Sequence, residues 1–297
     1  MNGLLGRMQI VRAKERVVKA EILLLGGHHT SIERMASFTE YFSQFGDVVV
    51  PDLPGFGGMA SFYEIGQVPT FDSYADYLAA FMKLRYKKRR VIIVGLSFSV
   101  PVAVKTLQKY PELQKKVDIL ISLSGFTHYQ DFKFGRFEIS FLKGLTSFLS
   151  WQIPAYLINK TLLRRKIVEA VYKIDYLNRK NNTRSNEARF NKRVKLDAEL
   201  WVINDFRTAM RTYKEMFKLD LCSDQQMNVP IFHVMSDQDQ YFHKTVSDQH
   251  FQIISSKFQA GSSIKSAHVP HIDATLSEIK DYIPAKLHKK LQSGALI

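Results

Sequence analysis

Ser97 stands at the centre of a short segment, GLSFS at positions 95–99. An apolar run at 91–94 comes directly before it, and residues 98–109 have the pattern of a helix. A serine held at a sharp turn between a buried strand and a helix is typical of a nucleophile elbow, because the turn exposes the hydroxyl at the end of the sheet. Small residues two positions to either side let the two backbones pass close together. The motif predicts a nucleophilic serine, and an ordinary tight turn is the alternative.

A serine nucleophile needs a carboxylate that orients its base, and two aspartates are candidates. On a mostly parallel sheet the acid and the base are expected beyond later strands, in the order serine, acid, histidine. Asp237 and Asp239 both follow the apolar run at 231–234. We predict Asp239 as the acid, because it lies four or five residues past the strand and can curl back over the end of the sheet. Asp237 is the alternative, and its other expected role is to shape the turn.

Two histidines in the segment SAHVPHID (266–273) are candidates for the base. His268 comes just before Pro270, a residue type that can open a helix, so His268 is expected on the preceding loop. His271 would fall in the first turn of that helix. We predict His268 as the base, with His271 as the alternative, because the segment follows the acid in the expected order.

The negative oxygen that forms when a serine attacks a carbonyl group needs two preorganised N–H donors. One predicted donor is the backbone amide of Phe98, directly after the serine. The other belongs to the loop GGHH at 26–29, where the amide of His28 is the first choice and that of Gly27 the alternative. His28 and His29 lack a carboxylate or a third histidine at ligand spacing, so we predict neither a metal site nor a cofactor.

The elements that must position these residues can be predicted from short apolar runs. Five runs are expected to form buried strands of a mostly parallel sheet: residues 22–25, 48–50, 91–94, 119–121 and 231–234. Helical patterns occur at residues 32–45, 72–85 and 98–109. Thr70 and Asp72 are suitable capping residues for the second helix, and residues 8–18 are expected to add edge strands. The order predicts an α/β fold with a doubly wound sheet that binds ligands at the carboxyl ends of its strands.

The alternation of strands and helices stops after residue 126. Residues 127–227 carry helical periodicity and few strand signals, and the next strand pattern begins soon after them. We predict an α-helical cap, residues 127–227, inserted into a core domain formed by residues 1–126 and 228–297. The insertion holds 19 of the 42 basic residues and 11 of the 28 acidic residues, so it carries +8 of the net charge of +14.

These motifs occur in the order found in the α/β-hydrolase fold superfamily, and the chain resembles a serine hydrolase with a helical cap domain. The similar segments are LGGH at 25–28, DLPGFG at 52–57, the elbow at 95–99, SDQD at 236–239 and HVP at 268–270. The resemblance implies a Ser97–His268–Asp239 triad and the inserted cap. Gly26 replaces the usual loop histidine, and Ser99 replaces the last glycine of the elbow. A serine rather than an aspartate as nucleophile argues against dehalogenase and epoxide hydrolase members.

A triad of this kind predicts acyl transfer through a serine ester. We expect hydrolysis of a carboxylic ester, with lipid-like esters among the candidates, because the cap is rich in large apolar groups. Another acyl-serine enzyme, such as a thioesterase, a C–C bond hydrolase or an acyltransferase, is the first alternative. A non-catalytic binding protein on the same fold is the second. The expected partner is a small-molecule acyl substrate.

The net charge of +14 favours either solubility or attraction to an anionic partner. We find no nucleic-acid-binding motif and expect no nucleic acid partner. The apolar segment 141–158, with Lys143, Lys160 and the basic run 164–166, is a candidate for contact with an anionic membrane surface. The alternative is a cap helix that packs on the sheet domain. A single cysteine, no signal-peptide pattern and no long apolar run favour a cytoplasmic protein, and the oligomeric state stays open.

Overall fold

The computed structural model describes residues 3–178, 187–262, 268, 270 and 274–295. Within these residues, seven strands form one sheet in the order β1-β3-β2-β4-β5-β6-β7, in which β1 is antiparallel to β3 and the other pairs are parallel. The strands are β1 (Met8–Val11), β2 (Glu21–Leu25), β3 (Val48–Pro51), β4 (Val91–Leu96), β5 (Val117–Leu123), β6 (Ile231–Val234) and β7 (Phe258–Ala260). Parallel pairing brings the carboxyl ends of β2, β4 and β6 to one edge, where the candidate site residues follow them.

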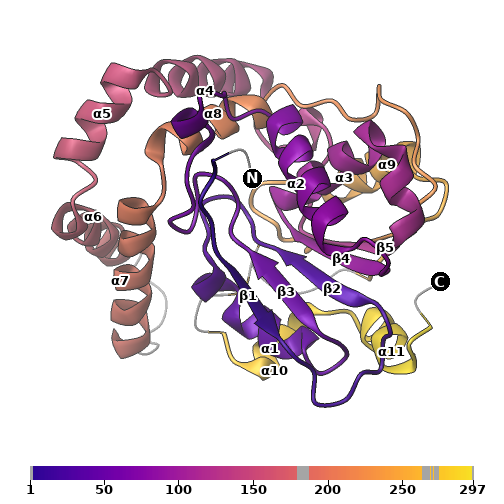
Figure 1. The fold of residues 1–297 in the computed structure, drawn as a ribbon. Coiled ribbons are helices and arrows are strands. Elements are labelled where there is room, and N and C mark those ends of the chain that lie inside the picture. The colour runs from indigo at the N-terminus through magenta and orange to yellow at the C-terminus, as the bar shows by residue number, and fades with distance from the viewer. Residues whose placement is uncertain (1–2, 179–186, 263–267, 269, 271–273, 296–297) are drawn as a thin grey trace.

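Helices cover both faces of the sheet (Figure 1). The two layers are α1 (Ala36–Phe42), α10 (Leu276–Tyr282) and α11 (Ala285–Ser293) on one face, and α2 (Phe71–Arg85), α3 (Ser99–Lys109) and α9 (Lys244–Ile254) on the other. Strand β4 shows why both layers are needed. Its residues Val91 and Ile93 belong to one apolar core, and Ile92 and Val94 belong to the other. A strand that is apolar on both sides must be covered on both sides, which produces the doubly wound sheet.

The predicted α/β fold is confirmed, and the differences lie at the edges of the sheet. Each of the five predicted runs lies within a strand. Of residues 8–18 only Met8–Val11 form a strand, whereas the amides of Val17 and Val18 both donate to the carbonyl oxygen of Phe45. Strand β7 has no counterpart among the predicted strands. It is three residues long and partly exposed, so no buried apolar run marks it in the sequence.

The helices begin close to their predicted positions. Thr70 caps α2, and its hydroxyl accepts a backbone N–H of the first turn at 3.1 Å. The predicted helix at 32–45 is divided into a 3-10 turn, Ile32–Met35, and α1. Helix α3 begins at Ser99 with Phe98 as its N-cap, one residue later than predicted. Ser97 therefore lies outside the helix, in the turn before it.

The described helices between β5 and β6 all fall in the region predicted as an insertion. They are α4 (Arg136–Leu149), α5 (Gln152–Thr161), α6 (Arg165–Asn178), α7 (Glu187–Ile203) and α8 (Phe206–Met216). Helix α4 packs on α8 and α6 packs on α7, and the group forms an arc on one side of the molecule (Figure 1). Two backbone hydrogen bonds close its base, from the Tyr129 amide to the Leu219 oxygen at 2.8 Å and from the Leu221 amide to the Thr127 oxygen at 3.1 Å. None of the described helices has the length and apolar character to cross a membrane.

His233 is a fully buried titratable group on β6. Its Nδ1 atom lies 2.8 Å from Oγ of Ser122 on β5. Burial lowers the pKa of His233 to about 3, so the ring is neutral in the folded protein well into the acid range. In the unfolded chain an imidazole titrates near pH ~6.5, so the unfolded state binds the proton first. The folded state therefore loses stability as the pH falls from about 6.5 toward 3.

We expect this single group to remove about 2 kcal/mol of folding stability between about pH 7 and about pH 5. The variant His233→Gln keeps a polar side chain but cannot titrate. Its free energy of unfolding should be lower at neutral pH, yet should fall by about 2 kcal/mol less than that of the wild type over the same range. Urea unfolding of both proteins at several pH values measures the difference. Equal losses in the two proteins would contradict a buried neutral histidine.

Candidate active site

Ser97 lies in a sharp turn between β4, which ends at Leu96, and α3. Its φ of 50° is in the left-handed region, which residues other than glycine seldom adopt and which is typical of a nucleophile elbow. Backbone hydrogen bonds hold the turn: the Ser97 amide donates to the Leu123 oxygen at 2.8 Å, and the Ser97 oxygen accepts the Val100 amide at 3.0 Å. A Cβ added to Gly95 would lie 3.3 Å from the backbone of Val100, so strand and helix pass as closely as the motif predicts.

Ser99 takes the elbow position where glycine is the commoner residue, and its side chain has a structural role there. The buried hydroxyl accepts the amide N–H of Leu96 and donates to the carbonyl oxygen of Leu25, both at 2.9 Å. Because Leu25 is the last residue of β2, Ser99 ties the elbow to the neighbouring strand. The departure from glycine thus adds a side-chain bridge beneath the serine.

A continuous set of hydrogen bonds joins three of the predicted site residues. Nδ1 of His268 donates to Oδ2 of Asp239 at 2.5 Å, and Nε2 accepts from Oγ of Ser97 at 3.1 Å. Each residue follows a different strand, Ser97 after β4, Asp239 after β6 and His268 after β7. Asp237, the alternative acid, is exposed in the turn before Asp239, and His271, the alternative base, lies outside the described residues. An imidazole in this tautomer presents an unprotonated nitrogen to the serine and can take its proton.

Asp239 is buried, and both of its carboxylate oxygens accept hydrogen bonds. Oδ1 accepts the amides of Tyr241 and Phe242 at 2.8 and 3.0 Å. Burial by itself raises the pKa of Asp239, but the hydrogen bond and charge of His268 and the two amides together outweigh it. The pKa of Asp239 therefore lies below its ordinary value, and the group is a carboxylate at neutral pH.

Ser124 and Tyr282, which the sequence does not single out, fix the backbone of His268. Their hydroxyls donate to the carbonyl oxygen of His268 at 2.7 and 2.9 Å, and they lie 2.6 Å from each other. Ser124 follows β5 with a φ of 48°, and Tyr282 is the last residue of α10. A position at the carboxyl end of a buried strand is a signal that could have identified Ser124. Nothing in the sequence indicates that Tyr282 lies beside the histidine.

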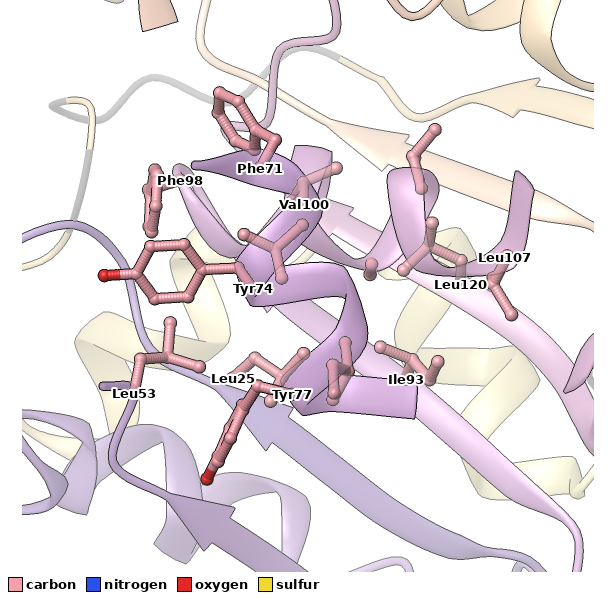
Figure 2. Packing of buried hydrophobic residues seen from close by; sticks show 14 of the residues in the cluster. Leu25, Leu53, Phe71, Tyr74, Tyr77, Ile93, Phe98, Val100, Leu107 and Leu120 are labelled. Carbon is pink, nitrogen blue, oxygen red and sulfur yellow. The ribbon is translucent and has the colours of Figure 1, made fainter. Parts of the chain in front are cut away.

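Phe98, whose amide is the first predicted oxyanion donor, is anchored in the apolar core. Its ring is buried, and its centroid lies 5.5 Å from that of Phe71 and 5.3 Å from that of Tyr74, both on α2 (Figure 2). The Tyr74 ring meets the Phe98 ring edge to face, a geometry in which aromatic rings attract one another, and close packing around the buried ring restricts its movement. The contacts therefore fix the residue that follows the serine, and with it the direction of its amide.

The loop after β2 holds the second predicted donor and contacts the elbow directly. A Cβ added to Gly27 would lie 3.7 Å from Cβ of Ser97, so the loop backbone passes beside the serine. Among the described residues, no acceptor takes the amide N–H of His28 or that of Phe98. Both groups thus remain able to donate to a bound ligand.

The side chains of His28 and His29 fasten this loop to the insertion. Nε2 of His28 lies 2.8 Å from Oγ1 of Thr212 on α8. Nδ1 of His29 accepts from Nδ2 of Asn204 at 3.1 Å, and its ring lies 4.0 Å from the ring of Trp201 on α7. Burial lowers the pKa of each ring to about 3, so both are neutral at physiological pH.

A cavity of about 470 Å³ opens beside Ser97 and His268. Its opposite wall comes from the insertion and includes Tyr172, Trp201, Tyr213 and Met216. Arg34 and Asp197 form an ion pair at 2.6 Å on one side of the cavity. The aromatic lining also includes Phe126 and Phe242 from the core domain, and Phe132 at the base of the insertion. A cavity of this size, with much apolar lining and a few polar groups, is typical of a small-molecule site.

A doubly wound sheet that carries a serine at its elbow and helices over its carboxyl edge is the architecture of an α/β-hydrolase. A family model described as serine aminopeptidase, S33, matches residues 16–268, and the chain belongs to this family. The protein is therefore a hydrolase, and the non-catalytic interpretation is set aside. A comparison with curated protein sequences gives no match.

Solved structures share this fold over nearly the whole chain. An esterase from Exiguobacterium antarcticum is 14% identical with a TM-score of 0.69, and the match covers 99% of this chain and 97% of the esterase. A hydrolase from Oleispira antarctica is 16% identical with a TM-score of 0.66, covering 96% and 94%. An epoxide hydrolase from Bacillus megaterium is 13% identical with a TM-score of 0.64, covering 98% and 97%. At these identities the likeness establishes the fold.

Because the Ser99 hydroxyl bridges the elbow and β2, its removal should lower the free energy of unfolding. Ser99→Ala leaves the amide of Leu96 and the oxygen of Leu25 without their buried partner, which should lower the free energy of unfolding by about 1–3 kcal/mol. Chemical denaturation measures the loss. Ser293→Ala, which removes an exposed serine hydroxyl on α11, is the matched control and should change stability by less than about 0.5 kcal/mol. Equal effects of the two substitutions would show that the bridge is not stabilising.

Proposed function

We propose that the protein is a serine hydrolase that cleaves carboxylic esters through an acyl-serine intermediate. Ser97 is the nucleophile, His268 the general base and acid, and Asp239 the carboxylate that orients the imidazole. The amides of Phe98 and His28 bind the oxyanion. The proposal is carried by the hydrogen-bonded path that runs from the Asp239 carboxylate through the imidazole to the serine hydroxyl.

The reaction proceeds in two halves. Oγ of Ser97 attacks the ester carbonyl carbon while Nε2 of His268 takes the hydroxyl proton, and the two amides stabilise the negative tetrahedral oxygen. Collapse of this intermediate releases the alcohol, which receives the proton from His268. Water then gives a proton to His268 and attacks the acyl-serine, and the acid leaves as Ser97 regains its proton. Asp239, whose pKa is lowered, stays ionised and stabilises the imidazolium.

In this proposal residues 127–227 act as a cap that selects the substrate. Aromatic side chains from the cap and the core line much of the cavity, which suits an acyl chain or another apolar group. The Arg34–Asp197 ion pair gives the cavity a charged, hydrogen-bonding side. An ester that joins an apolar acyl part to a polar alcohol part matches both sides of this cavity.

Replacement of Ser97 by alanine removes the attacking oxygen. We expect kcat/KM for a short-chain nitrophenyl ester to fall by at least about 10³-fold, and labelling by a fluorophosphonate probe to disappear. Thermal unfolding of the variant controls for loss of the fold. Labelling that survives Ser97→Ala would rule out Ser97 as the nucleophile.

A panel of substrates that share one acyl chain tests the preference for esters. It contains an oxygen ester, a thioester and a β-diketone, each assayed with and without an added alcohol as acyl acceptor. The highest kcat/KM for the oxygen ester, with water as the favoured acceptor, supports the proposal. A higher value for the thioester or the diketone, or faster transfer to the alcohol, would replace it by the corresponding alternative.

The assignment of Asp239 rather than Asp237 as the acid predicts very different losses of kcat when each aspartate is replaced by asparagine. Asp239→Asn removes the charge and favours the wrong imidazole tautomer, so kcat should fall by about 10³–10⁴-fold. Asp237→Asn makes the same chemical change two residues earlier in the exposed turn and should leave kcat within about twofold. Steady-state kinetics on one ester compare the two variants. A larger loss in Asp237→Asn would reassign the acid.

A further inference from the structure

Exposed apolar side chains are concentrated on the outer helices of the insertion. Among the described residues, 12 of the 22 large apolar side chains that are exposed lie between positions 137 and 174. We refer to these twelve as the apolar rim: Phe137, Phe141, Leu145, Phe148, Trp151, Ile153, Tyr156, Leu157, Leu162, Ile167, Val171 and Ile174. Large exposed apolar areas on a soluble fold are typical of interaction surfaces, because water disfavours them unless something covers them.

Helix α4 shows that the rim is not required for packing within the insertion. Its rim residues Phe137, Phe141 and Leu145 are spaced by four, and Phe148 follows after three, so all four lie on one face. The inward residues of α4 that pack on the core are Ile139, Leu142 and Leu149. A helix needs one apolar stripe to pack on a core, so the second stripe of α4 is free for another purpose.

The rim continues from α4 through α5 and α6. The rings of Phe148 and Trp151 lie 5.7 Å apart across the junction of α4 and α5. On α6 the rim residues Ile167, Val171 and Ile174 are spaced by four and three, so they also share a face. Figure 1 shows α4, α5 and α6 as the outer part of the arc, with α8 and α7 on its inner side.

Basic residues outnumber acidic ones in the segment that carries the rim. Between positions 136 and 174 the basic residues are Arg136, Lys143, Lys160, Arg164, Arg165, Lys166 and Lys173, and the acidic residues are Glu138 and Glu169. Nζ of Lys160 lies 5.0 Å above the ring of Tyr156, which brings a cation directly beside rim residues. A second copy of the chain seated on this surface would place two strongly positive faces together. An anionic surface would be attracted instead.

We propose that the apolar rim docks on the surface of an anionic phospholipid bilayer. The aromatic and aliphatic side chains enter the boundary between headgroups and acyl chains, and the neighbouring lysines and arginines contact lipid phosphates. Helices of this kind lie in the plane of the interface, as expected where no described helix could cross the bilayer. Tyr172 on α6 lines the cavity while Val171 and Ile174 belong to the rim, so α6 separates the docked surface from the cavity. The proposal does not rest on the ester chemistry.

Sedimentation with vesicles tests the docking without any turnover. The full chain is mixed with vesicles of phosphatidylcholine, with or without phosphatidylglycerol, at about 0.05 M and about 0.5 M salt. We expect binding to the phosphatidylglycerol vesicles at low salt and a marked loss at high salt, because salt screens the attraction between basic side chains and anionic lipid.

Matched variants separate the rim from general surface hydrophobicity. The rim variant carries Phe137→Ser, Phe141→Ser and Phe148→Ser at side chains that are 85%, 62% and 51% exposed. The control carries Leu5→Ser, Leu84→Ser and Ile253→Ser at side chains that are 80%, 62% and 52% exposed and lie outside the insertion. We expect vesicle binding to fall at least about tenfold in the rim variant and to be unchanged in the control. Thermal unfolding midpoints confirm that both remain folded.

A third variant, Lys160→Gln with Lys166→Gln, tests the charge. Binding should fall by about fivefold for each basic side chain removed near the anionic surface. No sedimentation of the wild type at low salt, or equal binding by the rim and control variants, would overturn the proposal. So would a dimer seen by analytical ultracentrifugation that is lost in the rim variant, because a second copy would then cover this surface.

Discussion

At Ser97 the backbone holds a φ of 50°, a conformation that an L-residue keeps only when its surroundings fix it. Hydrogen bonds to the Leu123 oxygen and from the Val100 amide fix it on two sides. The Ser99 hydroxyl ties the turn to β2, and the Phe98 ring anchors it in the core. Every other part of the site is placed relative to this turn. The strained conformation of Ser97 costs free energy. Packing at the end of the central strand of the doubly wound sheet offsets this cost.

The remaining parts of the site reach the serine from distant segments, and each has its own support. Asp239 is held by two amides, and the ammonium of Lys133 donates to its carbonyl oxygen. The His268 backbone is held by Ser124 and Tyr282. Lys133 belongs to the chain just before α4, so the base of the insertion also steadies the acid loop. The insertion is therefore connected to the candidate catalytic residues as well as to the cavity they face.

The sequence could predict what depends on local pattern and order. Uniformly apolar runs identified the buried strands, and the serine and the acid could be ranked because each follows such a run. The histidine could be ranked because it comes after the acid in the chain and just before Pro270. Tyr282 could not be found in this way, since its contact with His268 exists only after α10 packs on the sheet. The insertion was ambiguous for another physical reason. Helix α4 is apolar on both faces, so its sequence pattern is equally compatible with packing on the core and with contact with a partner. The structure shows that one set of apolar residues packs on the core and that a different set is exposed.

The cavity wall beside the serine carries no charge at the loop that holds His28 and His29. His28 and His29 stay neutral because burial lowers the pKa of each to about 3. Each ring is also hydrogen-bonded to a side chain of the insertion. In the proposed reaction, the negative charge that develops on the substrate oxygen beside Ser97 thus meets oriented amide dipoles and uncharged rings. Dipoles fixed in this way neither gain nor lose protons in the physiological range, so their pull on the charge is independent of pH. In the proposed mechanism the loop therefore supplies a fixed electrostatic environment, and His268 is the group that gains and loses the proton.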